Sequence, residues 1–474
     1  MKICSIRIKG YQQFEDIYLD FTHPETGEPL DKICFIGRNG TGKSTVLNLI
    51  NNTLNQFHQT EGAHSNSFLA NLSGPFNEKK ILLIKLKLNN RFVYHFSSRF
   101  ANTLRAAILK PEIESIGEDW FDIINRPDWM QTIEQGNSIH QHFAIEGQEL
   151  KTLVDENLFH DNSSDLLIYS PAESSNNSYL SVSDVPQTNF NEALKLFQNF
   201  GFNHLVSDEN VHEFWRLLIF LIKKRDSERE EYENRPENIN KTKKQLIKEF
   251  DAISPRILDK LAILWNKILE KAGLEFDVEN ARSPIQLTEN LHAYIRLKKS
   301  KQKIRYDQLS TGIRNFIFRI GHIYSLYFNR EIKRGFLLVD EPENSLFPDF
   351  LFELMETYQE IVKDKNGENN TQFFVSTHNP IIAAQFEPYE RIILEWNEDG
   401  YVEASKGHAP AGDDPNDVLE KDFKLTHVMG KKGQEMWDEY LRLRKQLRRT
   451  EEEYRKKELI SKIQEIGTAY NFEE

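Results

Sequence analysis

The sequence predicts an α/β fold in which a mixed sheet is flanked by helices. Three segments rich in apolar residues carry this prediction, at residues 32–36, 335–339 and 373–377. Continuous apolarity of this kind is typical of strands buried on both faces of a parallel sheet. The segments end in glycine, in acidic residues and in histidine, and ligands bind at the carboxyl ends of such strands. We therefore expect a ligand site where these strands end.

The N-terminal part of the chain, residues 1–190, predicts several further strands. Residues 3–8 and 17–21 form a hairpin that leads into the first buried strand. Residues 80–88 and 91–96 predict a second strand pair, joined by an Asn-Asn turn. One more short apolar run, ending before a Ser/Asn-rich loop, predicts a further buried strand at residues 166–169.

A glycine-rich segment follows the first buried strand and matches the phosphate-loop pattern G-x-x-x-x-G-K-[ST] at every fixed position. It consists of Gly37, Arg38, Asn39, Gly40, Thr41, Gly42, Lys43, Ser44 and Thr45. Glycines let the backbone N–H groups point at phosphates, and the helix predicted at residues 44–54 presents its positive end to the same anion. Lys43 would bind the β- and γ-phosphates, and the Ser44 hydroxyl would bind Mg²⁺. The segment therefore predicts a site for ATP and Mg²⁺.

Residues 191–275 predict a helical insertion. A helical stripe at residues 214–222 is followed by the polar segment 223–248, in which Pro236 marks the tip of a projecting helical hairpin. We expect Ser254 to cap the returning helix. The charged tip favours a solvated surface, and a binding surface is the alternative.

Residues 276–405 complete the predicted sheet. The strand at residues 335–339 ends in Asp340 and Glu341. Asp340 is expected to hold Mg²⁺ through water or a serine hydroxyl, and Glu341 to act as general base on the attacking water. His378 ends the next strand, where it is either a sensor of the γ-phosphate or a structural residue.

Residues 406–474 predict a helical tail. Before it, residues 391–396 and 401–403 are expected to form a hairpin. Within the tail, residues 413–422 are acidic and turn-like. Residues 434–466 predict one long helix or a helix pair. This segment contains a basic cluster, defined by Arg442, Arg444, Lys445, Arg448 and Arg449. The cluster favours a solvated helix face, and docking to nucleic acid or to a partner is the alternative.

Taken together, these motifs resemble those of the ABC-type ATPases. The chain has, in order, the phosphate loop, Leu-Ser-x-Gly at residues 309–312, the strand with Asp-Glu and the strand with His. Within that family it is similar to the RecF/SMC-like branch and its overcoming-lysogenisation-defect relatives. Residues 340–348 are similar to that branch's D-E-P-E-x-x-L-H-P, and residues 376–380 to its S-T-H-x-P. The resemblance implies an ABC-type P-loop ATPase head with a helical insertion.

The resemblance also implies a homodimer, or a higher homo-oligomer, that closes face to face on ATP. The implied trans signature, which would bind the γ-phosphate held by Lys43 of the other copy, consists of Ser310, Thr311 and Gly312. The implied dimer loop contains Asn344 and Ser345. The implied catalytic residues are Glu341, His378 and Lys43, and the implied metal ligands are Ser44 and Asp340.

The sequence departs from the family motifs in two places. One glycine of Leu-Ser-Gly-Gly is replaced, and Phe347 stands where L-H-P has its histidine. Both changes are compatible with slow turnover. The family's water-binding glutamine has no evident counterpart, and a residue at 170–173 is expected to serve in its place.

Composition limits the functional classes. The net charge is −13, which argues against a surface that coats nucleic acid and allows a local basic patch. The two cysteines, Cys4 and Cys34, are expected to be buried thiols, so neither a disulfide framework nor a zinc site is predicted. No signal peptide or membrane span is evident, and we expect a cytoplasmic protein with no membrane partner.

Three functional interpretations stay open. In the first, the chain resembles the ATPase subunits of Septu-type and PARIS-type antiphage systems, which implies a separate effector nuclease of HNH or Toprim kind and no nuclease domain here. In the second, the chain is a RecF-like repair ATPase that binds duplex DNA. In the third, it is a scaffold that uses ATP only to join subunits.

Overall fold

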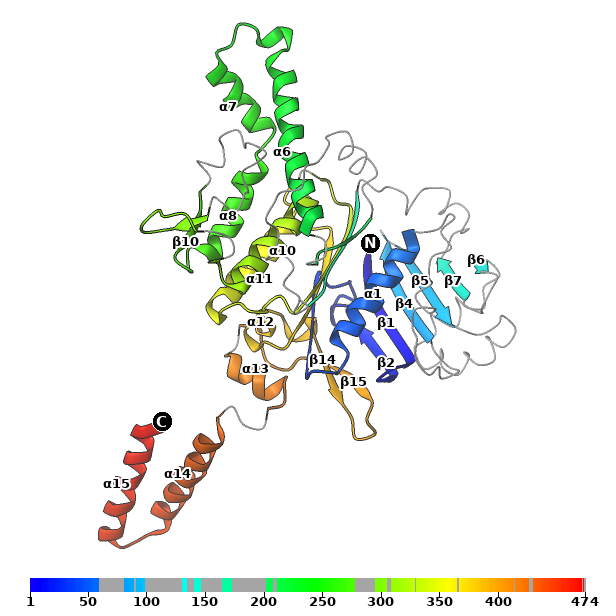
Figure 1. Ribbon diagram of the computed structural model, residues 1–474. Coiled ribbons are helices and arrows are strands. Elements are labelled where there is room, and N and C mark those ends of the chain that lie inside the picture. Colours follow the sequence, from blue (N-terminus) through cyan, green and yellow to red (C-terminus); the bar gives the residue numbers. More distant parts are fainter. Residues whose placement is uncertain are drawn as a thin grey trace.

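The computed structural model of the chain describes 15 segments. They are residues 1–58, 81–88, 91–98, 130–133, 140–145, 164–172, 202–207, 211–277, 295–304, 308–328, 330–364, 366–412, 414–425, 429–470 and 472. Figure 1 shows a central sheet with helices on both sides, a second sheet beside it, and two helical projections.

The central sheet has seven strands in the order β15-β14-β3-β13-β12-β8-β9. Their bounds are β3 Lys32–Gly37, β8 Asp165–Ser170, β9 Asn203–Leu205, β12 Arg334–Asp340, β13 Thr371–Thr377, β14 Arg391–Trp396 and β15 Val402–Lys406. Neighbouring strands are parallel, except that β14 and β15 form an antiparallel hairpin. The predicted mixed sheet is therefore confirmed, including its three buried strands.

The strand register brings the candidate site residues to one edge of this sheet. Asp340 at the end of β12 pairs with Ser376 of β13, and Ser376 pairs with Phe35 of β3. Because the three strands are parallel, their carboxyl ends meet at the same edge. The phosphate loop, which starts at Gly37, is therefore separated from Asp340 by the end of β13.

A second sheet is antiparallel and has six strands in the order β2-β1-β4-β5-β7-β6. Their bounds are β1 Lys2–Tyr11, β2 Phe14–Asp20, β4 Ile81–Leu88, β5 Arg91–Ser98, β6 Met130–Ile133 and β7 His140–Ile145. The two predicted strand pairs, β1–β2 and β4–β5, are confirmed, and β1 joins them by pairing with β4.

The central strands are buried on both faces because alternate side chains enter two different cores. In β13, Phe374 packs in the core shared with the second sheet, whereas Phe373 and Val375 pack in the core on the opposite face. Helix α1, Lys43–His58, lies in the first core through Val46 and Ile50. The opposite face is covered by helices (Figure 1). This layering explains why β12 and β13 read as continuous apolar runs.

The remaining helices follow the sheet in sequence. Their bounds are α6 Val211–Glu233, α7 Lys243–Ile253, α8 Ile257–Leu269, α10 Thr311–Tyr327, α11 Leu351–Ile361, α12 Pro380–Ala383, α13 Pro415–Lys421, α14 Lys431–Arg449 and α15 Glu453–Tyr470. Short 3₁₀ turns occur at Pro236–Asn238, Pro348–Phe350 and Pro388–Glu390. Two short strands, β10 Leu274–Phe276 and β11 Ile295–Leu297, pair antiparallel with each other.

The predicted helical insertion contains α6, α7 and α8, but its base belongs to the main core. Phe214 of α6 and Trp265 of α8 are buried against α10, where a Cβ on Gly321 would come within 2.9 Å of both rings. The far end of α6 and α7 projects from the body (Figure 1). The predicted projecting hairpin is therefore present, and it is anchored rather than separate.

The predicted cap of the returning helix is wrong. Ser254 ends α7, where its N–H donates to the Phe250 carbonyl at 2.8 Å, and α8 starts after Arg256 without a side-chain cap. The strong N-cap lies one helix earlier, because Thr242 and Gln245 form a reciprocal capping box at the start of α7. Ser254 is held instead by the Arg225 guanidinium, which donates to its carbonyl at 2.9 Å.

The predicted acidic turn at residues 413–422 contains helix α13. Asp414 caps this helix by accepting the Asn416 N–H at 2.8 Å. Asp422, which follows it, is buried and lies 2.9 Å from the Arg391 guanidinium at the start of β14. Asp414 is therefore used for capping and Asp422 for a buried ion pair, in a segment that contains a helix, and residue 413 lies outside the described residues.

Of the two alternatives for the C-terminal tail, the structure has a helix pair. Helices α14 and α15 are separated by the short connection at residues 450–452 and lie apart from the body (Figure 1). Tyr440, Leu443 and Leu459 are the buried residues of the pair.

Candidate functional site

The phosphate loop connects β3 to α1 and depends on its glycines. Gly37, Gly40 and Gly42 have φ values of 151°, 85° and 94°, which side chains with a Cβ rarely adopt. A Cβ on Gly37 would overlap the Leu394 carbonyl oxygen, and one on Gly42 would overlap the side chains of Gln13 and Phe14. The loop therefore requires glycine at two positions for packing as well as for backbone conformation.

Lys43 is the buried cation of this loop. Its Nζ donates to the carbonyl oxygens of Gly37 at 2.8 Å and Arg38 at 3.3 Å, so the side chain curls over the loop. Burial lowers the pKa of Lys43, while the negative charges of Glu341 and Asp340 act in the opposite direction. These carboxylates are therefore close enough to act on the lysine, which couples the phosphate loop electrostatically to the end of β12.

The other loop residues divide into structural and accessible groups. Thr41 is buried, and its hydroxyl donates to the Arg38 carbonyl at 2.9 Å. Arg38, Asn39 and Ser44 are exposed. Ser44, at the start of α1, is exposed, and its role as a metal ligand stays a prediction.

Asp340 lies at the carboxyl end of β12 and is buried. The hydroxyl of its register partner Ser376 donates to Asp340 Oδ1. One oxygen of Asp340 is thereby oriented by a neighbouring strand, which leaves the other carboxylate oxygen for a different ligand. This arrangement fits a metal ligand held in a fixed direction.

Glu341 starts the loop after β12 and has a φ of 44°, although it is not glycine. Its N–H donates to the Ser376 carbonyl at 2.9 Å, and its Oε2 accepts from Asn344 Nδ2 at 3.2 Å. Its Oε1 lies 3.3 Å from Nδ1 of His378. The side chain of Glu341 is 24% exposed and that of His378 is 50% exposed, so both are accessible from solvent.

Glu343 is a residue to which the sequence reasoning assigned no role. It is buried, and its Oε1 accepts the hydroxyl of Thr377 and the N–H of His378, the latter at 3.2 Å. The same oxygen lies 3.6 Å from His378 Nδ1. His378 is thus placed between two carboxylates. The available signal was the third acid of Asp-Glu-Pro-Glu, but the direction of its side chain cannot be inferred from spacing.

The predicted trans signature lies beside the predicted dimer loop of the same chain. Ser310 caps α10 by accepting the Ile313 N–H at 3.4 Å. Thr311 is the first residue of that helix, and Gly312 packs so closely that a Cβ would overlap the Ser345 carbonyl oxygen. Ser310 and Ser345 are exposed. The stretch around residue 310 is therefore at the same edge as the loop after β12.

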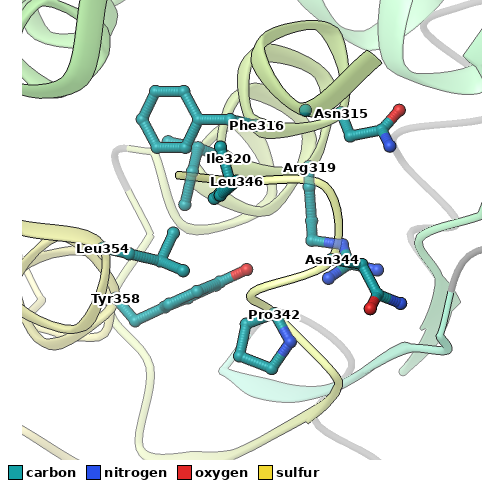
Figure 2. A pocket seen from close by; sticks show the side chains of 10 residues that line it. Asn315, Phe316, Arg319, Ile320, Pro342, Asn344, Leu346, Leu354 and Tyr358 are labelled. Atoms are coloured by element: carbon teal, nitrogen blue, oxygen red, sulfur yellow. The ribbon is translucent and has the colours of Figure 1, made fainter. Parts of the chain in front are cut away.

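Arg319 connects this helix to two strand ends. Its guanidinium donates to the carbonyl oxygens of Pro171 at 2.8 Å and Glu341 at 3.3 Å. Figure 2 shows its side chain extending from α10 toward the loop that carries Pro342 and Asn344. Pro171 follows β8 and lies in the region, residues 170–173, that is expected to replace the water-binding glutamine. Glu173 of that region lies outside the described residues.

The structure thus brings Asp340, Glu341, Asn344 and His378 together at the ends of β12 and β13, next to the phosphate loop. Within the described residues no group of three or more His, Cys, Asp and Glu side chains could by itself hold a metal ion. At a phosphate-loop site, Mg²⁺ takes one or two protein ligands and the nucleotide's phosphates. The residues present, namely the glycine cradle, the buried Lys43, Ser44 and Asp340, fit ATP.

The two cysteines are buried, as expected. Cys4 and Cys34 are buried free thiols, and burial raises the pKa of Cys4 to about 11. Among the described helices, none has both the length and the apolarity to span a bilayer.

Comparison with known proteins agrees with this site. A family model described as an AAA ATPase domain matches residues 1–383, and a search among curated proteins found no match. The matched part extends from β1 to α12 and includes the phosphate loop, Asp340, Glu341 and His378. It supports the resemblance to ABC/SMC-like P-loop ATPases. The chain therefore belongs to the AAA ATPase domain family, and it is an ATP-binding ATPase with an α/β head.

Proposed function

We propose that this ATPase is a switch in which two copies close on two ATP molecules and separate after hydrolysis. The observation that carries the proposal is the contact of Gly312 with Ser345. This contact connects two parts of the same chain. One is helix α10, which would bind the nucleotide of a partner, and the other is the loop that carries Glu341. Closure of the dimer would therefore act directly on the hydrolytic residues.

In the proposed reaction, Lys43 binds the β- and γ-phosphates, and Ser44 and Asp340 hold Mg²⁺. Magnesium would supply charge neutralisation on the phosphates. Glu341 orients the attacking water and accepts its proton, since its carboxylate is accessible and Asn344 directs one of its oxygens. His378 lies beside Oε1 of Glu341, whereas Asn344 bonds to Oε2, and His378 would contact the γ-phosphate region.

The partner's contribution would come from residues 310–312. Ser310 is exposed at the N-terminus of α10, a helix of 17 residues whose first N–H groups and positive dipole end suit a phosphate. Asn344 and Ser345 would contact the other copy beside it.

The trans arrangement is tested by mixing two inactive variants. Lys43→Ala lacks a phosphate-binding lysine, and Ser310→Arg places a bulky side chain at the signature. A mixed dimer of the two contains one site with both residues intact, so mixing should restore ATPase activity that neither variant has alone. No recovery at any ratio, with heterodimers verified by differently tagged subunits, would contradict a site shared between copies.

The hydrolytic role is tested with Glu341→Gln. This variant should bind ATP, lose about 10²- to 10⁴-fold in turnover, and accumulate ATP-dependent dimers in light scattering. Asn397→Asp is the matched control. It also exchanges an amide and a carboxyl group, but in the exposed turn before β15. Wild-type turnover in Glu341→Gln would exclude Glu341 as the base. Wild-type protein that binds ATP without any turnover would instead favour the scaffold interpretation.

We further propose that the ATP state controls a separate nuclease of HNH or Toprim kind in bacterial antiphage defence. The support is the motif resemblance to Septu-type and PARIS-type ATPase subunits, together with two helical projections that offer surfaces to a partner (Figure 1). Co-expression with a nuclease encoded beside this gene should give a complex and protection from phage that Lys43→Ala abolishes.

A RecF-like role in DNA repair is the second candidate, and the basic cluster of α14 is the observation that favours it. Arg442, Lys445, Arg448 and Arg449 are exposed there, on a chain that is acidic as a whole. Binding of duplex DNA by the purified protein, weakening with added salt and with charge reversal of this cluster, would support it.

A further inference from the structure

Glu343 occupies an unusual position in the loop after β12. It is two residues beyond Glu341, its side chain is 5% exposed, and it points back toward β13 rather than toward solvent. Burial raises the pKa of this carboxyl group. Its Oε2 atom is buried and has no hydrogen-bond partner among the described residues.

A carboxyl group with one unsatisfied oxygen is not what stability alone would favour. A buried polar atom that loses its hydrogen bonds to water destabilises the folded state unless a new partner replaces them. An apolar side chain of similar size would avoid that loss at this position. A functional role would explain why a carboxyl group occurs at this position. Such a role depends on the contacts of its other oxygen, Oε1.

Oε1 of Glu343 joins two strand ends. It accepts the Thr377 hydroxyl and the His378 N–H, and both donors lie at the carboxyl end of β13, whereas Glu343 itself belongs to the loop after β12. The same atom lies 3.6 Å from His378 Nδ1. One oxygen thereby fixes the backbone of His378 and faces its imidazole ring.

This contact lies beside two proposed catalytic groups. Glu341 is on the same loop as Glu343, and its Oε1 lies 3.3 Å from His378 Nδ1. If the Glu343 contact were removed, the loop after β12 and the end of β13 would lose a direct link beside the reacting atoms. A displacement of about 1 Å at such a site is enough to reduce turnover by about 10²-fold.

We propose that Glu343 is a positioning residue that holds His378 at its working distance from Glu341 during ATP hydrolysis. It acts through the oxygen Oε1, by accepting two hydrogen bonds, and it does not touch the nucleotide. The inference rests on the proposed roles of Glu341 and His378.

The test compares Glu343→Ala with Glu343→Gln in steady-state ATPase assays of the full chain. Alanine removes the acceptor, and kcat should fall by about 10- to 10²-fold, while KM for ATP and the affinity for a fluorescent ATP analogue change less than about threefold. Glutamine keeps an acceptor oxygen at the same place and should retain most of the turnover. Glu390→Ala is the matched control, because Glu390 is also buried but precedes β14, at the opposite edge of the sheet.

A double-mutant cycle with His378→Ala shows whether the effect passes through the histidine. In that background, Glu343→Ala should cause little further loss. The inference is overturned if the loss persists undiminished there, if glutamine is as inactive as alanine, or if Glu343→Ala turns over like wild type. If Glu343→Ala does not fold, Thr377→Val removes one donor of the same contact and should lower kcat, whereas Thr377→Ser should not.

The outcome is separable from that of the proposed function. If Glu341→Gln and His378→Ala both keep wild-type turnover, the proposed catalytic roles fail. If they lose turnover and Glu343→Ala does not, only the positioning role fails.

Discussion

Two loops at the same edge of the central sheet carry the proposed ATP site, and both contain residues with positive φ, which they accommodate by different means. The phosphate loop has positive φ at Gly37, Gly40 and Gly42, where glycine permits it. The loop after β12 has positive φ at Glu341 and Ser345, at 44° and 63°, where a Cβ makes it unfavourable.

The second loop keeps this conformation because other parts of the molecule hold it. The Glu341 N–H bonds to Ser376 of β13, and the Glu341 carbonyl accepts from Arg319 of α10. Gly312 packs against the carbonyl of Ser345. Strained residues of this kind cost about 1–3 kcal/mol each and persist when the surroundings fix them. The phosphate loop is therefore determined locally, and the loop after β12 by tertiary contacts.

The largest expected effect is on ATP affinity, and it comes from a change in the phosphate loop. Lys43→Ala should lower ATP affinity by about 10²-fold or more, because it removes a buried charge-assisted contact to phosphate. Equilibrium binding of a fluorescent ATP analogue measures the change. Lys421→Ala, which removes an exposed lysine of α13, serves as the control. Undiminished affinity would mean that the nucleotide is not held at this loop.

The next largest effect should follow from a change in the contact between α10 and the second loop. Gly312→Ala places a Cβ on the Ser345 carbonyl, and we expect turnover to fall by about 10²-fold while binding at the phosphate loop changes little. Gly433→Ala, in a helix where the added Cβ has ordinary contacts, is the matched control. Equal turnover in both variants would show that this contact does not support hydrolysis.

A pair of glycine variants tests the local determination of the phosphate loop. Gly42→Ala combines positive φ with overlap on Gln13 and Phe14, so the free energy of unfolding should drop by about 2–3 kcal/mol. Gly40→Ala has positive φ but open space and should lose only about 1 kcal/mol. Urea unfolding measures both. The opposite ranking would contradict the role assigned to packing.

The smallest effect concerns strain in the second loop. Ser345→Gly should raise the free energy of unfolding by up to about 1 kcal/mol, because glycine adopts positive φ without the Cβ penalty. Ser345→Ala keeps the Cβ and should show no gain. A less stable glycine variant would indicate that the loop is not strained at this residue.

Much of the fold was predictable because its signals are local. The apolar runs of β3, β12 and β13 predicted buried parallel strands, and the glycine pattern predicted the turn from β3 into α1. The start of the returning helix was predicted wrongly, since Ser254 and Pro255 fit a helix start, whereas Ser254 ends α7 and α8 begins after Arg256. Helix α13 was missed because its acidic residues serve as a cap and as the buried partner of Arg391, which is distant in sequence.

The sequence by itself determined which groups are candidates to meet ATP, because a lysine and a serine follow the glycines of the phosphate loop and two acids end a buried strand. Tertiary structure alone decided how the second half of the site is held. Glu343 reaches His378 across two parallel strands, and Arg319 and Gly312 support a loop that is distant in sequence. Such contacts depend on strand register and helix packing, which the order of residues within any single element does not specify.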